Sequence, residues 1–329
     1  MKFLIVGLGS IGRRHMHNLL ALGQRDIILY RTHRSTLPND ELLSFPTETN
    51  LDKALSLDPD AVIISNPTSL HLEVAIPAAQ AGCHLLLEKP ISHSMERVDE
   101  LYKSVESGGG KVLVGYQYRF HPGLQKVRDL LKEGAIGRPL SVRAHWGEYL
   151  PGWHPWEDYQ LGYSARNDLG GGVVLTLSHP LDYLRWLLGD IEELWSFTAS
   201  LGDLGLNVED TAEIGMRFSN GVMGSVHLDY NQQPPNHYLE LIGTGGTIYW
   251  EYARGGVRLY RSEGNEWQTL TISEDFERND MFLAEMDHFI SLIQGTENPI
   301  CSLADGIRVL ELVHAAKQSA ADEKMVRLE

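Results

Sequence analysis

The tripeptide Glu88-Lys89-Pro90 places a charged pair directly after the apolar run 85–87. Such a run is typical of a buried strand in a parallel sheet, and ligands bind in the crevice at the carboxyl ends of such strands. Pro90 disfavours helical backbone geometry at Lys89, which would help to aim the ammonium group, and Glu88 could hold that group in place. Taken alone, Lys-Pro is also an ordinary surface-loop dipeptide. We therefore interpret Lys89 as a candidate whose assignment depends on the rest of the chain.

The segment Gly7-Leu8-Gly9-Ser10-Ile11-Gly12 matches the spacing G-x-G-x-x-G. The match alone is weak because the chain has 32 glycines, but it follows an apolar strand and opens a helical pattern. In this context Gly7 allows a tight turn, Gly9 lets the backbone approach a pyrophosphate, and Gly12 allows the helix to pack closely on the strand. The motif, with Ser10 and Ile11 inside it, predicts a dinucleotide site. A purely structural strand–helix turn is the alternative.

The end of the second predicted strand normally separates NAD from NADP, because an acidic residue there accepts hydrogen bonds from the ribose 2′-OH. Here the sequence is Leu29-Tyr30-Arg31-Thr32-His33-Arg34, which has no carboxylate. The guanidinium groups of Arg31 and Arg34 suit the geometry of a 2′-phosphate. The sequence therefore favours NADP(H) over NAD(H), with a pair of solvated surface arginines as the alternative.

Residues 148–159 are unusually aromatic for a stretch that contains two prolines. Prolines limit flexibility, so the segment could form a stiff wall. Aromatic faces pack against sugar C–H groups while polar side chains bind hydroxyls, and Arg166 further on could meet a carboxylate or phosphate. The predicted substrate residues are Tyr149, Trp153, His154, Trp156 and Arg166. A buried aromatic plug or a subunit interface is the alternative interpretation.

Short apolar runs alternate with amphipathic segments over the first third of the chain. We predict strands at 2–6, 27–30, 61–65, 85–87 and 112–114, and helices at 11–22, 70–81 and 95–107. Strands that are apolar without alternation and are separated by helices indicate a parallel sheet covered on both faces. The pattern changes after about residue 119, where successive strand-like runs with Gly and Asn turns indicate an antiparallel sheet. Two amphipathic helices, 281–294 and 305–319, follow that sheet.

Composition limits the possible partners. The 329 residues exceed one ordinary core and suit two domains, which we place at 1–119 and 120–329. The 44 acidic and 28 basic residues give a formal charge of −16, which disfavours nucleic acid and anionic membrane surfaces. Two cysteines are too few for a disulfide framework, and no apolar run is long enough for a signal peptide or a membrane helix. We expect a cytoplasmic protein. No metal site is predicted, because the histidines lack the paired spacing of a catalytic zinc site.

Four motifs in one order resemble the glucose–fructose oxidoreductase, inositol dehydrogenase and rhizopine-catabolism (MocA) family. They are the glycine motif at 7–12, Asn66-Pro67-Thr68-Ser69-Leu70-His71, Glu88-Lys89-Pro90 and residues 115–122. Residues 170–172, followed by His179 and Asp182, are similar to the second-domain signature of that family. The resemblance implies a Rossmann domain, a doubly wound parallel sheet that binds NAD(P), followed by an α+β domain with a large open, mainly antiparallel sheet. It also implies a homodimer or homotetramer.

The resemblance implies roles for individual residues. It implies hydride transfer between nicotinamide and a hydroxyl-bearing carbon of a sugar, cyclitol or nucleotide sugar. Lys89 would orient the reacting oxygen and the cofactor, and His179 would be the acid/base, for which an imidazole pKa of about 6.5 is suited. Further cofactor contacts are implied for Asn66, Pro67, His71, Glu88, Lys89 and Gln117.

One departure from the family pattern concerns His179. Relatives commonly carry an aspartate four residues earlier, where this chain has Leu175, with Thr176 beside it. Asp182 could orient His179 instead. Alternatively, Asp182 is structural and His179 is a satisfied polar group. Pro180 disfavours an uninterrupted helix through this point.

Three functions compete. A branch of the family found beside enzymes that make nine-carbon acidic sugars resembles residues 153–182, which points to an amino-sugar or nucleotide-sugar substrate and a reaction with NADP(H). The second is an NAD-dependent cyclitol or aldose dehydrogenase. The third, of another class, is a non-catalytic dinucleotide sensor that regulates a protein partner. The presence of both Lys89 and His179 disfavours the sensor.

Overall fold

A computed structural model describes residues 1–32, 37, 40–155, 157–253, 256–272 and 275–328. The chain divides into two compact units. The first comprises Met1–Gln117, Asp168–Gly170 and Arg278–Leu310, and the second comprises Tyr118–Asn167, Gly171–Glu277 and Glu311–Glu329. The sequence-based boundary at residue 119 falls close to the first division, but residues 278–310, placed in the second domain by that boundary, lie in the first unit.

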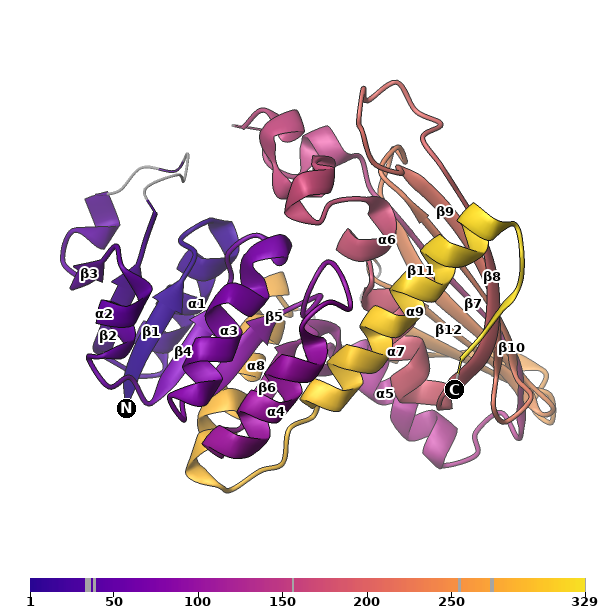
Figure 1. The fold of residues 1–329 in the computed structure, drawn as a ribbon. Helices are drawn as coiled ribbons and strands as arrows, with labels where there is room; N and C mark the ends of the chain where they lie inside the picture. The colour runs from indigo at the N-terminus through magenta and orange to yellow at the C-terminus, as the bar shows by residue number, and fades with distance from the viewer. Residues whose placement is uncertain (33–36, 38–39, 156, 254–255, 273–274, 329) are drawn as a thin grey trace. The chain divides into compact units, whose positions relative to one another are not determined.

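The first unit is built on six parallel strands in the order β3-β2-β1-β4-β5-β6 (Figure 1). Strand β4 is apolar and buried throughout, and β1 is apolar and buried after its first residue, Lys2, as expected of a sheet covered on both faces. The chain leaves β1 toward β2 on one side and returns to β4 on the other, which makes the carboxyl ends of β1 and β4 a topological switch point. The strands are β1 (Lys2–Val6), β2 (Asp26–Tyr30), β3 (Thr47–Glu48), β4 (Ala61–Ile64), β5 (His84–Glu88) and β6 (Val112–Gly115).

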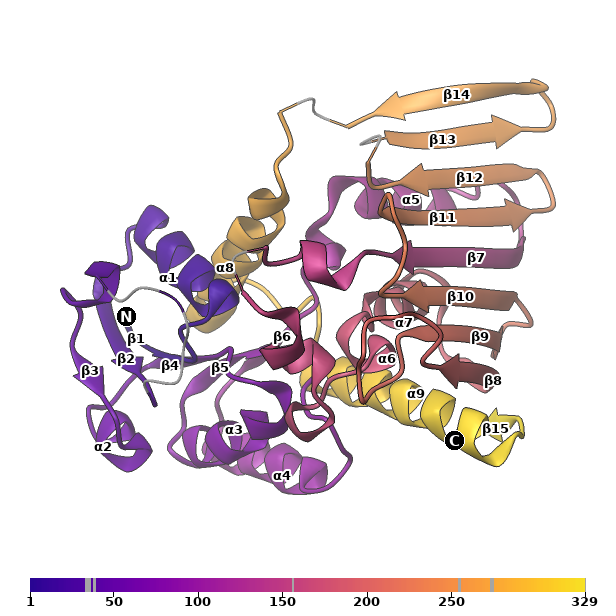
Figure 2. The same cartoon turned by 90° about the horizontal axis from the view of Figure 1, so that it is seen from above.

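Helices cover both faces of this sheet. Helix α1 packs with α8, and α3 packs with α4 on the opposite side (Figure 2). Helix α4 begins at Val98, three residues later than the sequence pattern predicts, after Arg97 in a left-handed conformation. The helices are α1 (Ser10–Ala21), α2 (Leu51–Leu55), α3 (His71–Gln80), α4 (Val98–Gly108), α8 (Arg278–Gln294) and the first part of α9 (Leu303–Asp322), with 3₁₀ turns η1 (Asp40–Leu42), η2 (Thr68–Leu70) and η7 (Asn167–Leu169).

The second unit is built on one nine-stranded sheet, ordered β14-β13-β12-β11-β7-β10-β9-β8-β15 (Figure 2). Strand β7 runs parallel to β10, and the other neighbours are antiparallel. The predicted parallel sheet and mainly antiparallel sheet are therefore both confirmed. The strands are β7 (Pro139–Gly147), β8 (Ile191–Ala199), β9 (Thr211–Phe218), β10 (Met223–Asp229), β11 (Asn236–Gly243), β12 (Gly246–Glu251), β13 (Gly256–Arg261), β14 (Glu266–Thr271) and β15 (Val326–Arg327).

One face of this large sheet packs on helices. Side chains alternate along the strands, so that Trp146, Leu239 and Trp250 are buried on the helix side. We call the opposite side, which carries Arg143, His145 and their row neighbours, the outer face. The helices are α5 (Pro122–Lys132), α6 (Val173–Thr176), α7 (His179–Leu188) and the end of α9, and the 3₁₀ turns are η3 (Gln117–Phe120), η4 (Leu150–Gly152), η5 (Tyr159–Leu161) and η6 (Tyr163–Ala165).

Three smaller observations complete the fold. Helices α6 and α7 are separate, with Pro180 in the first turn of α7, as the proline predicted. Both cysteines, Cys83 and Cys301, are buried, and neither forms a disulfide within the described residues. None of the helices traced in the described residues combines the length and apolarity needed to cross a membrane.

Candidate active site

The glycine motif forms the turn between β1 and α1. Gly7 has φ +88°, a left-handed conformation that other side chains rarely adopt. A side chain at Gly12 would overlap the carbonyl oxygen of Gly7, so only glycine lets α1 lie this close to the strand. At Gly9, by contrast, a Cβ atom would meet nothing within 4 Å, so the backbone before α1 faces open space.

This open helix end has the properties of an anion site. Gly9 is the N-cap of the 12-residue helix α1 and has no side chain that could cap it, and the first turn of the helix contains no acidic residue. The N–H groups at Ser10 and Ile11 therefore remain available, and the helix dipole favours negative charge there. The residues fit the pyrophosphate of a dinucleotide: Gly7, Gly9 and Gly12 would shape the turn, and the bound nicotinamide would supply the hydride carrier.

Arg31 follows β2 at the neighbouring strand end. Its side chain is buried, and its backbone N–H donates to the carbonyl oxygen of Glu48 at 3.0 Å. The end of β2 therefore presents a guanidinium where NAD-specific loops present a carboxylate. Arg34, the second arginine predicted here, lies outside the described residues.

His71 joins the loops that follow β4 and β5. Its Nε2 lies 2.9 Å from the carbonyl oxygen of Asn66, and its Nδ1 lies 3.0 Å from that of Pro90. Burial lowers the pKa of His71, and the two carbonyl oxygens together with Glu88 oppose that shift. His71 therefore fixes the loop that contains Lys89. Asn66 also donates to the carbonyl oxygen of Leu70 at 3.1 Å, next to the predicted contact Pro67.

Lys89 is half-buried at the carboxyl end of β5. Burial lowers the pKa of its ammonium group to about 8, helped by the positive charge of Arg278 and opposed by Glu88. A lysine with a pKa this close to neutrality is typical of functional sites, because structural lysines stay solvated and fully charged. Gln117, the other predicted contact in this unit, is buried.

Glu88 belongs to a buried cluster beneath Lys89. Its Oε1 lies 2.7 Å from Nε2 of His15, and its Oε2 accepts from the backbone N–H of Lys89 at 3.3 Å. Glu285 of α8 completes the cluster. One ring nitrogen of His15 and one carboxylate oxygen each of Glu88 and Glu285 lie within 4.8 Å of one another. Burial, and the negative charge of Glu88, raise the pKa of Glu285 well above its ordinary value. Glu285 therefore keeps its proton to a higher pH than an ordinary carboxyl group.

His179, the predicted acid/base, is the first residue of α7 and is buried among aromatic rings. The ring of Tyr118 lies edge-on to the imidazole at 4.9 Å between centroids, and the ring of Trp146 is 5.4 Å away. His237 stacks on Trp146 at 4.4 Å. These rings fix the orientation of the imidazole in a site of low polarity.

Asp182, one turn further along α7, is bound to Arg119. The guanidinium donates to both carboxylate oxygens, with the shortest N–O distance 2.6 Å from Nη2 to Oδ1. Both side chains are buried, so the pair is a desolvated, charge-assisted contact. The structure thus gives Asp182 a guanidinium partner that the sequence did not indicate.

The glycines at 170–172 lead into the short helix α6. Gly172 has φ +106°, and a side chain there would overlap the carboxylate of Glu209. The Oε1 of Glu209 accepts from the N–H of Val174 at 3.4 Å, so this acid caps α6. The absence of a side chain at Gly172 therefore lets the carboxylate of Glu209 contact the first turn of α6, the helix before His179.

The predicted substrate residues of the aromatic segment occupy different environments. Trp153 packs edge-on against Tyr230 at 5.6 Å between centroids. Tyr149 is exposed, whereas His154 and Arg166 are half-buried. Trp156 lies outside the described residues.

Family comparison identifies the chain. Residues 1–116 match the model described as the oxidoreductase family with an NAD-binding Rossmann fold, and residues 124–249 match the GFO/IDH/MocA C-terminal domain. The chain belongs to the GFO/IDH/MocA family. It is an NAD(P)-dependent oxidoreductase of the class that acts on CH–OH groups of sugars and related compounds.

Relatives of this GFO/IDH/MocA protein are informative about the fold. Myo-inositol 2-dehydrogenase of Thermotoga maritima is 28% identical, over 100% of this chain and 99% of its own. A levoglucosan dehydrogenase in complex with NADH and levoglucosan superimposes with a TM-score of 0.86 at 22% identity, covering 99% of both chains. The WlbA dehydrogenase of Bordetella pertussis, in complex with NADH and UDP-GlcNAcA, gives 0.82 at 23% identity, covering 100% of this chain and 98% of that one.

Sequence reasoning missed three residues that the structure places at these sites of the GFO/IDH/MocA chain. His15 lies three residues beyond the glycine motif, and its helical position could have placed it beneath the strand ends. Glu285 carried no local signal, because it arrives on a helix from the far end of the chain. Arg119 follows Tyr118 directly, and only the fold brings it to Asp182.

Glu285 gives a prediction about stability. The unfolded carboxyl has a pKa of about 4.3, and the folded value is higher, so above pH 4.3 the unfolded chain releases a proton that folded Glu285 keeps. Stability is therefore lost as pH rises, by up to about 1.4 kcal/mol per pH unit until the folded pKa is reached. The side chain of Glu285→Gln stays neutral at every pH, so the melting temperature of this variant should fall less than that of wild type between pH 5 and pH 8.5. Parallel melting curves against pH would contradict this, and exposed Glu73→Gln is the control.

Proposed function

We propose that this enzyme transfers a hydride between NADP(H) and a hydroxyl or keto carbon of an amino-sugar or nucleotide sugar. One observation carries the proposal. Lys89, with a pKa of about 8, stands on the same strand edge as the open, uncapped end of α1. An anion site at the same sheet edge as a lysine of lowered pKa supports a bound dinucleotide next to a catalytic group.

In this proposal Lys89 and His179 have different catalytic roles. In the oxidation, the C–H bond of the carbinol breaks as its electron pair leaves as hydride, and the O–H proton passes to the neutral imidazole of His179. The ammonium of Lys89 donates a hydrogen bond to the same oxygen as it gains negative charge. Asp182 is assigned a positioning role, because it binds Arg119 and so holds the helix that begins with His179.

The sugar class is inferred from the aromatic segment and Arg166. Tyr149 is exposed and Trp153 is half-buried, which leaves aromatic surface for sugar C–H groups. The planar guanidinium of half-buried Arg166 has the geometry for a bidentate contact with a phosphate or a carboxylate. The neighbour solved with UDP-GlcNAcA supports a nucleotide sugar, and myo-inositol 2-dehydrogenase supports the cyclitol alternative.

The preference for NADP(H) is inferred from Arg31. No carboxylate follows β2 in the described residues up to Thr32, and the first charged residue after the strand is Arg31, whose guanidinium suits a 2′-phosphate. The neighbours solved with NADH support dinucleotide binding and give no support to the preference.

The direct test is absorbance at the reduced-nicotinamide band, with each cofactor offered against sugars, cyclitols and nucleotide sugars. We expect turnover with an amino-sugar or nucleotide sugar, and a higher kcat/KM with NADP than with NAD. Turnover with inositol or an aldose alone would reject the proposed substrate class. Equal or better use of NAD would reject the assignment of Arg31.

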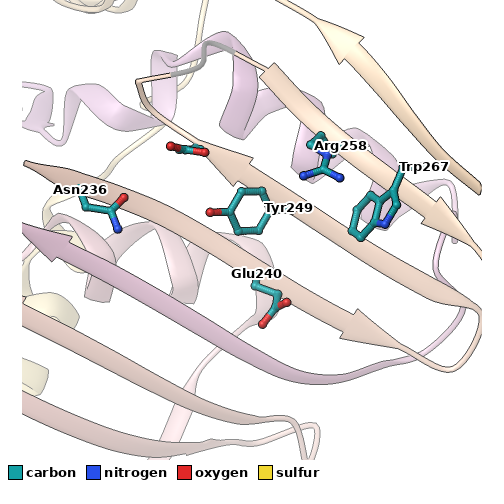
Figure 3. A pocket seen from close by; sticks show the side chains of 6 residues that line it. Asn236, Glu240, Tyr249, Arg258 and Trp267 are labelled. Atoms are coloured by element: carbon teal, nitrogen blue, oxygen red, sulfur yellow. The ribbon is translucent and has the colours of Figure 1, made fainter.

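We also propose that the protein is a homodimer or homotetramer assembled through the outer face. That face is aromatic: Tyr249, Arg258 and Trp267 line a shallow hollow together with Asn236, Glu240 and Glu251 (Figure 3). On strand β8, at the other end of the same face, the side chain of Phe197 is 69% exposed and lies beside Trp195. Large exposed aromatic patches are typical of subunit interfaces. Light scattering should give the mass of two or four chains, and Phe197→Glu should lower it; a monomeric wild type would reject the proposal.

A further inference from the structure

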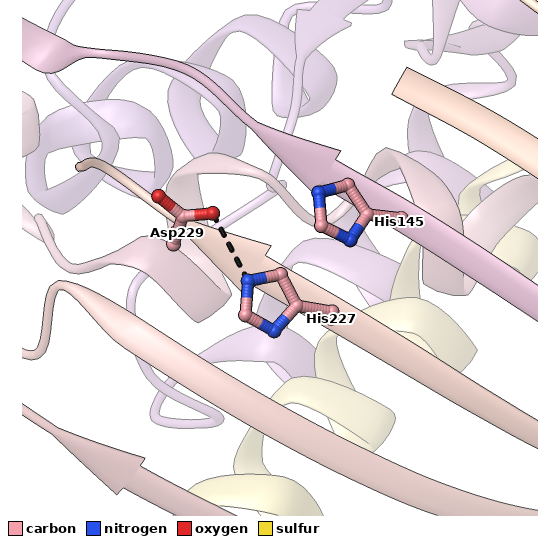
Figure 4. A group of neighbouring side chains, drawn as sticks. All are labelled: His145, His227 and Asp229. Carbon is pink, nitrogen blue, oxygen red and sulfur yellow. Dashed lines mark hydrogen bonds and ion pairs between the residues drawn. The ribbon is translucent and has the colours of Figure 1, made fainter. Parts of the chain in front are cut away.

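Two histidines and an aspartate meet on the outer face, where β7 and β10 run side by side (Figure 4). His145 and His227 are paired across the two strands, and Asp229 lies two residues further along β10, so it shares the face. One ligand atom from each lies within 4.8 Å of the others. The imidazole rings stack at 4.6 Å between centroids, with 14° between their planes.

His227 is fixed at both ring nitrogens. Nε2 lies 3.0 Å from Oδ2 of Asp229, and Nδ1 lies 2.5 Å from Oε1 of Glu213. The Oδ1 of Asp229 accepts from the N–H groups of Asn231 and Gln232, which directs Oδ2 toward the imidazole. A carboxylate on the far nitrogen of a histidine is the usual outer partner in metal sites, since it fixes the tautomer and raises the basicity of the ligand.

A fourth donor faces the same space. The Oε1 of Gln232 lies 2.5 Å from Nε2 of His145. A side chain at Gly147 would overlap both this oxygen and Oδ2 of Asp229, so the two oxygens converge over a position that has no Cβ. Tyr238 stacks on the other side of His145 at 5.2 Å, which leaves that imidazole little freedom to turn away.

We propose that His145, His227 and Asp229 bind one zinc-type divalent cation, with Gln232 supplying a fourth oxygen. Two imidazoles with a carboxylate suit zinc and its neighbours in the first transition series, whereas magnesium and calcium take oxygen-only sets. With metal–ligand bonds of about 2.0 Å, a tetrahedral site separates its ligand atoms by about 3.3 Å. The printed separations of 2.5 and 3.0 Å are slightly shorter than that value, and the ligand atoms of His145, His227 and Asp229 all lie within 4.8 Å of one another.

The cation would cross-link β7 to β10, the parallel pair within the described part of the sheet. These strands come from distant parts of the sequence and have no short connection between them. The site lies on the outer face, opposite to the face that carries His179, so the proposal does not depend on the hydride-transfer reaction. The spacing of the histidines in the sequence did not indicate this site, because His145 and His227 are 82 positions apart and meet only across β7 and β10.

Titration of the EDTA-treated full-length protein with ZnCl₂ in a calorimeter tests the proposal. We expect one high-affinity zinc per chain, and no such binding in the double variant His145→Gln/His227→Gln. The matched control is His17→Gln, which removes an exposed histidine from α1 and should bind zinc like wild type. Dinucleotide binding and the melting temperature without zinc report whether the variants are folded. Equal zinc binding by wild type and the double variant would overturn the proposal, as would no binding by folded wild type.

A second variant separates a coordination site from loose histidine binding. Glu213→Gln keeps all three proposed ligands and removes only the outer carboxylate on His227. We expect this variant to bind zinc about 10- to 100-fold more weakly, because outer partners contribute that much to affinity. Co²⁺ offers the spectroscopic readout, since a tetrahedral site gives strong visible absorption bands. Unchanged zinc affinity in Glu213→Gln, or Co²⁺ bands that persist in the double variant, would reject the assigned geometry.

Discussion

Lys89→Met should lower kcat/KM by about 10²- to 10⁴-fold while the protein still binds dinucleotide. Methionine keeps an unbranched side chain of similar length, so packing at the end of β5 changes little. The variant removes the ammonium that, in our proposal, donates to the reacting oxygen. A hydrogen bond made in a poorly solvated site is stronger than one made in water, which is why its loss should be large.

The pH dependence gives this prediction its sign. Burial lowers the pKa of Lys89 to about 8, so the protonated fraction falls as pH rises through that value. Only the protonated form donates the proposed hydrogen bond. Wild-type kcat/KM should therefore fall on the alkaline side with an apparent pKa near 8. Lys89→Arg should move this limb to higher pH, because a guanidinium stays protonated throughout.

The controls for Lys89 separate catalysis from folding and from dinucleotide binding. Lys103→Met removes an exposed lysine of α4 in the same unit and should leave kcat/KM unchanged. Fluorescence titration of the reduced cofactor should give Kd values within a few-fold of wild type for both variants. Wild-type turnover by Lys89→Met would contradict the assigned role. An alkaline limb that stays near pH 8 in Lys89→Arg would show that another group titrates there.

The fold of the first unit was predictable because its signals are local. The strand at 2–6, the glycine turn and the helix after it follow from adjacent residues, and these segments fold as β1 and α1. The break before α7 was also predictable, since Pro180 lacks the N–H that an uninterrupted helix would need. The carboxyl-end position of Lys89 followed from the order of strands and helices alone.

Contacts between distant segments were not predictable in this way. Nothing near Glu88 in the sequence indicates that His15 and Glu285 lie around it, and Glu285 arrives on α8 after the whole second sheet. The assignment of residues 278–310 to the first unit has the same cause, because an amphipathic helix does not specify which apolar surface it will cover. The Arg119–Asp182 pair likewise forms between α7 and the η3 turn, which are far apart in the sequence.

The second large effect is expected at His179. His179→Gln should lower kcat/KM by about 10²- to 10⁴-fold, because an amide cannot accept the substrate proton. Glutamine retains hydrogen-bonding capacity and most of the volume, so a residue needed only for packing would tolerate the change. Added imidazole should partly restore turnover to His179→Ala, since a small base can enter the space left by the ring. Near-wild-type turnover in His179→Gln would contradict the acid/base assignment.

Asp182→Asn, on the same helix, should lower the stability of the fold, whereas His179→Gln should lower turnover. The carboxylate is held by Arg119 in a buried pair, and removing one charge leaves the guanidinium desolvated without its partner. Breaking such a pair costs about 3–5 kcal/mol of stability. Asp182→Asn should therefore melt at a clearly lower temperature, while the protein that remains folded keeps the pH profile of wild type. If instead the variant melts like wild type and loses turnover, Asp182 acts in the reaction itself, and the positioning role assigned to it through Arg119 is wrong.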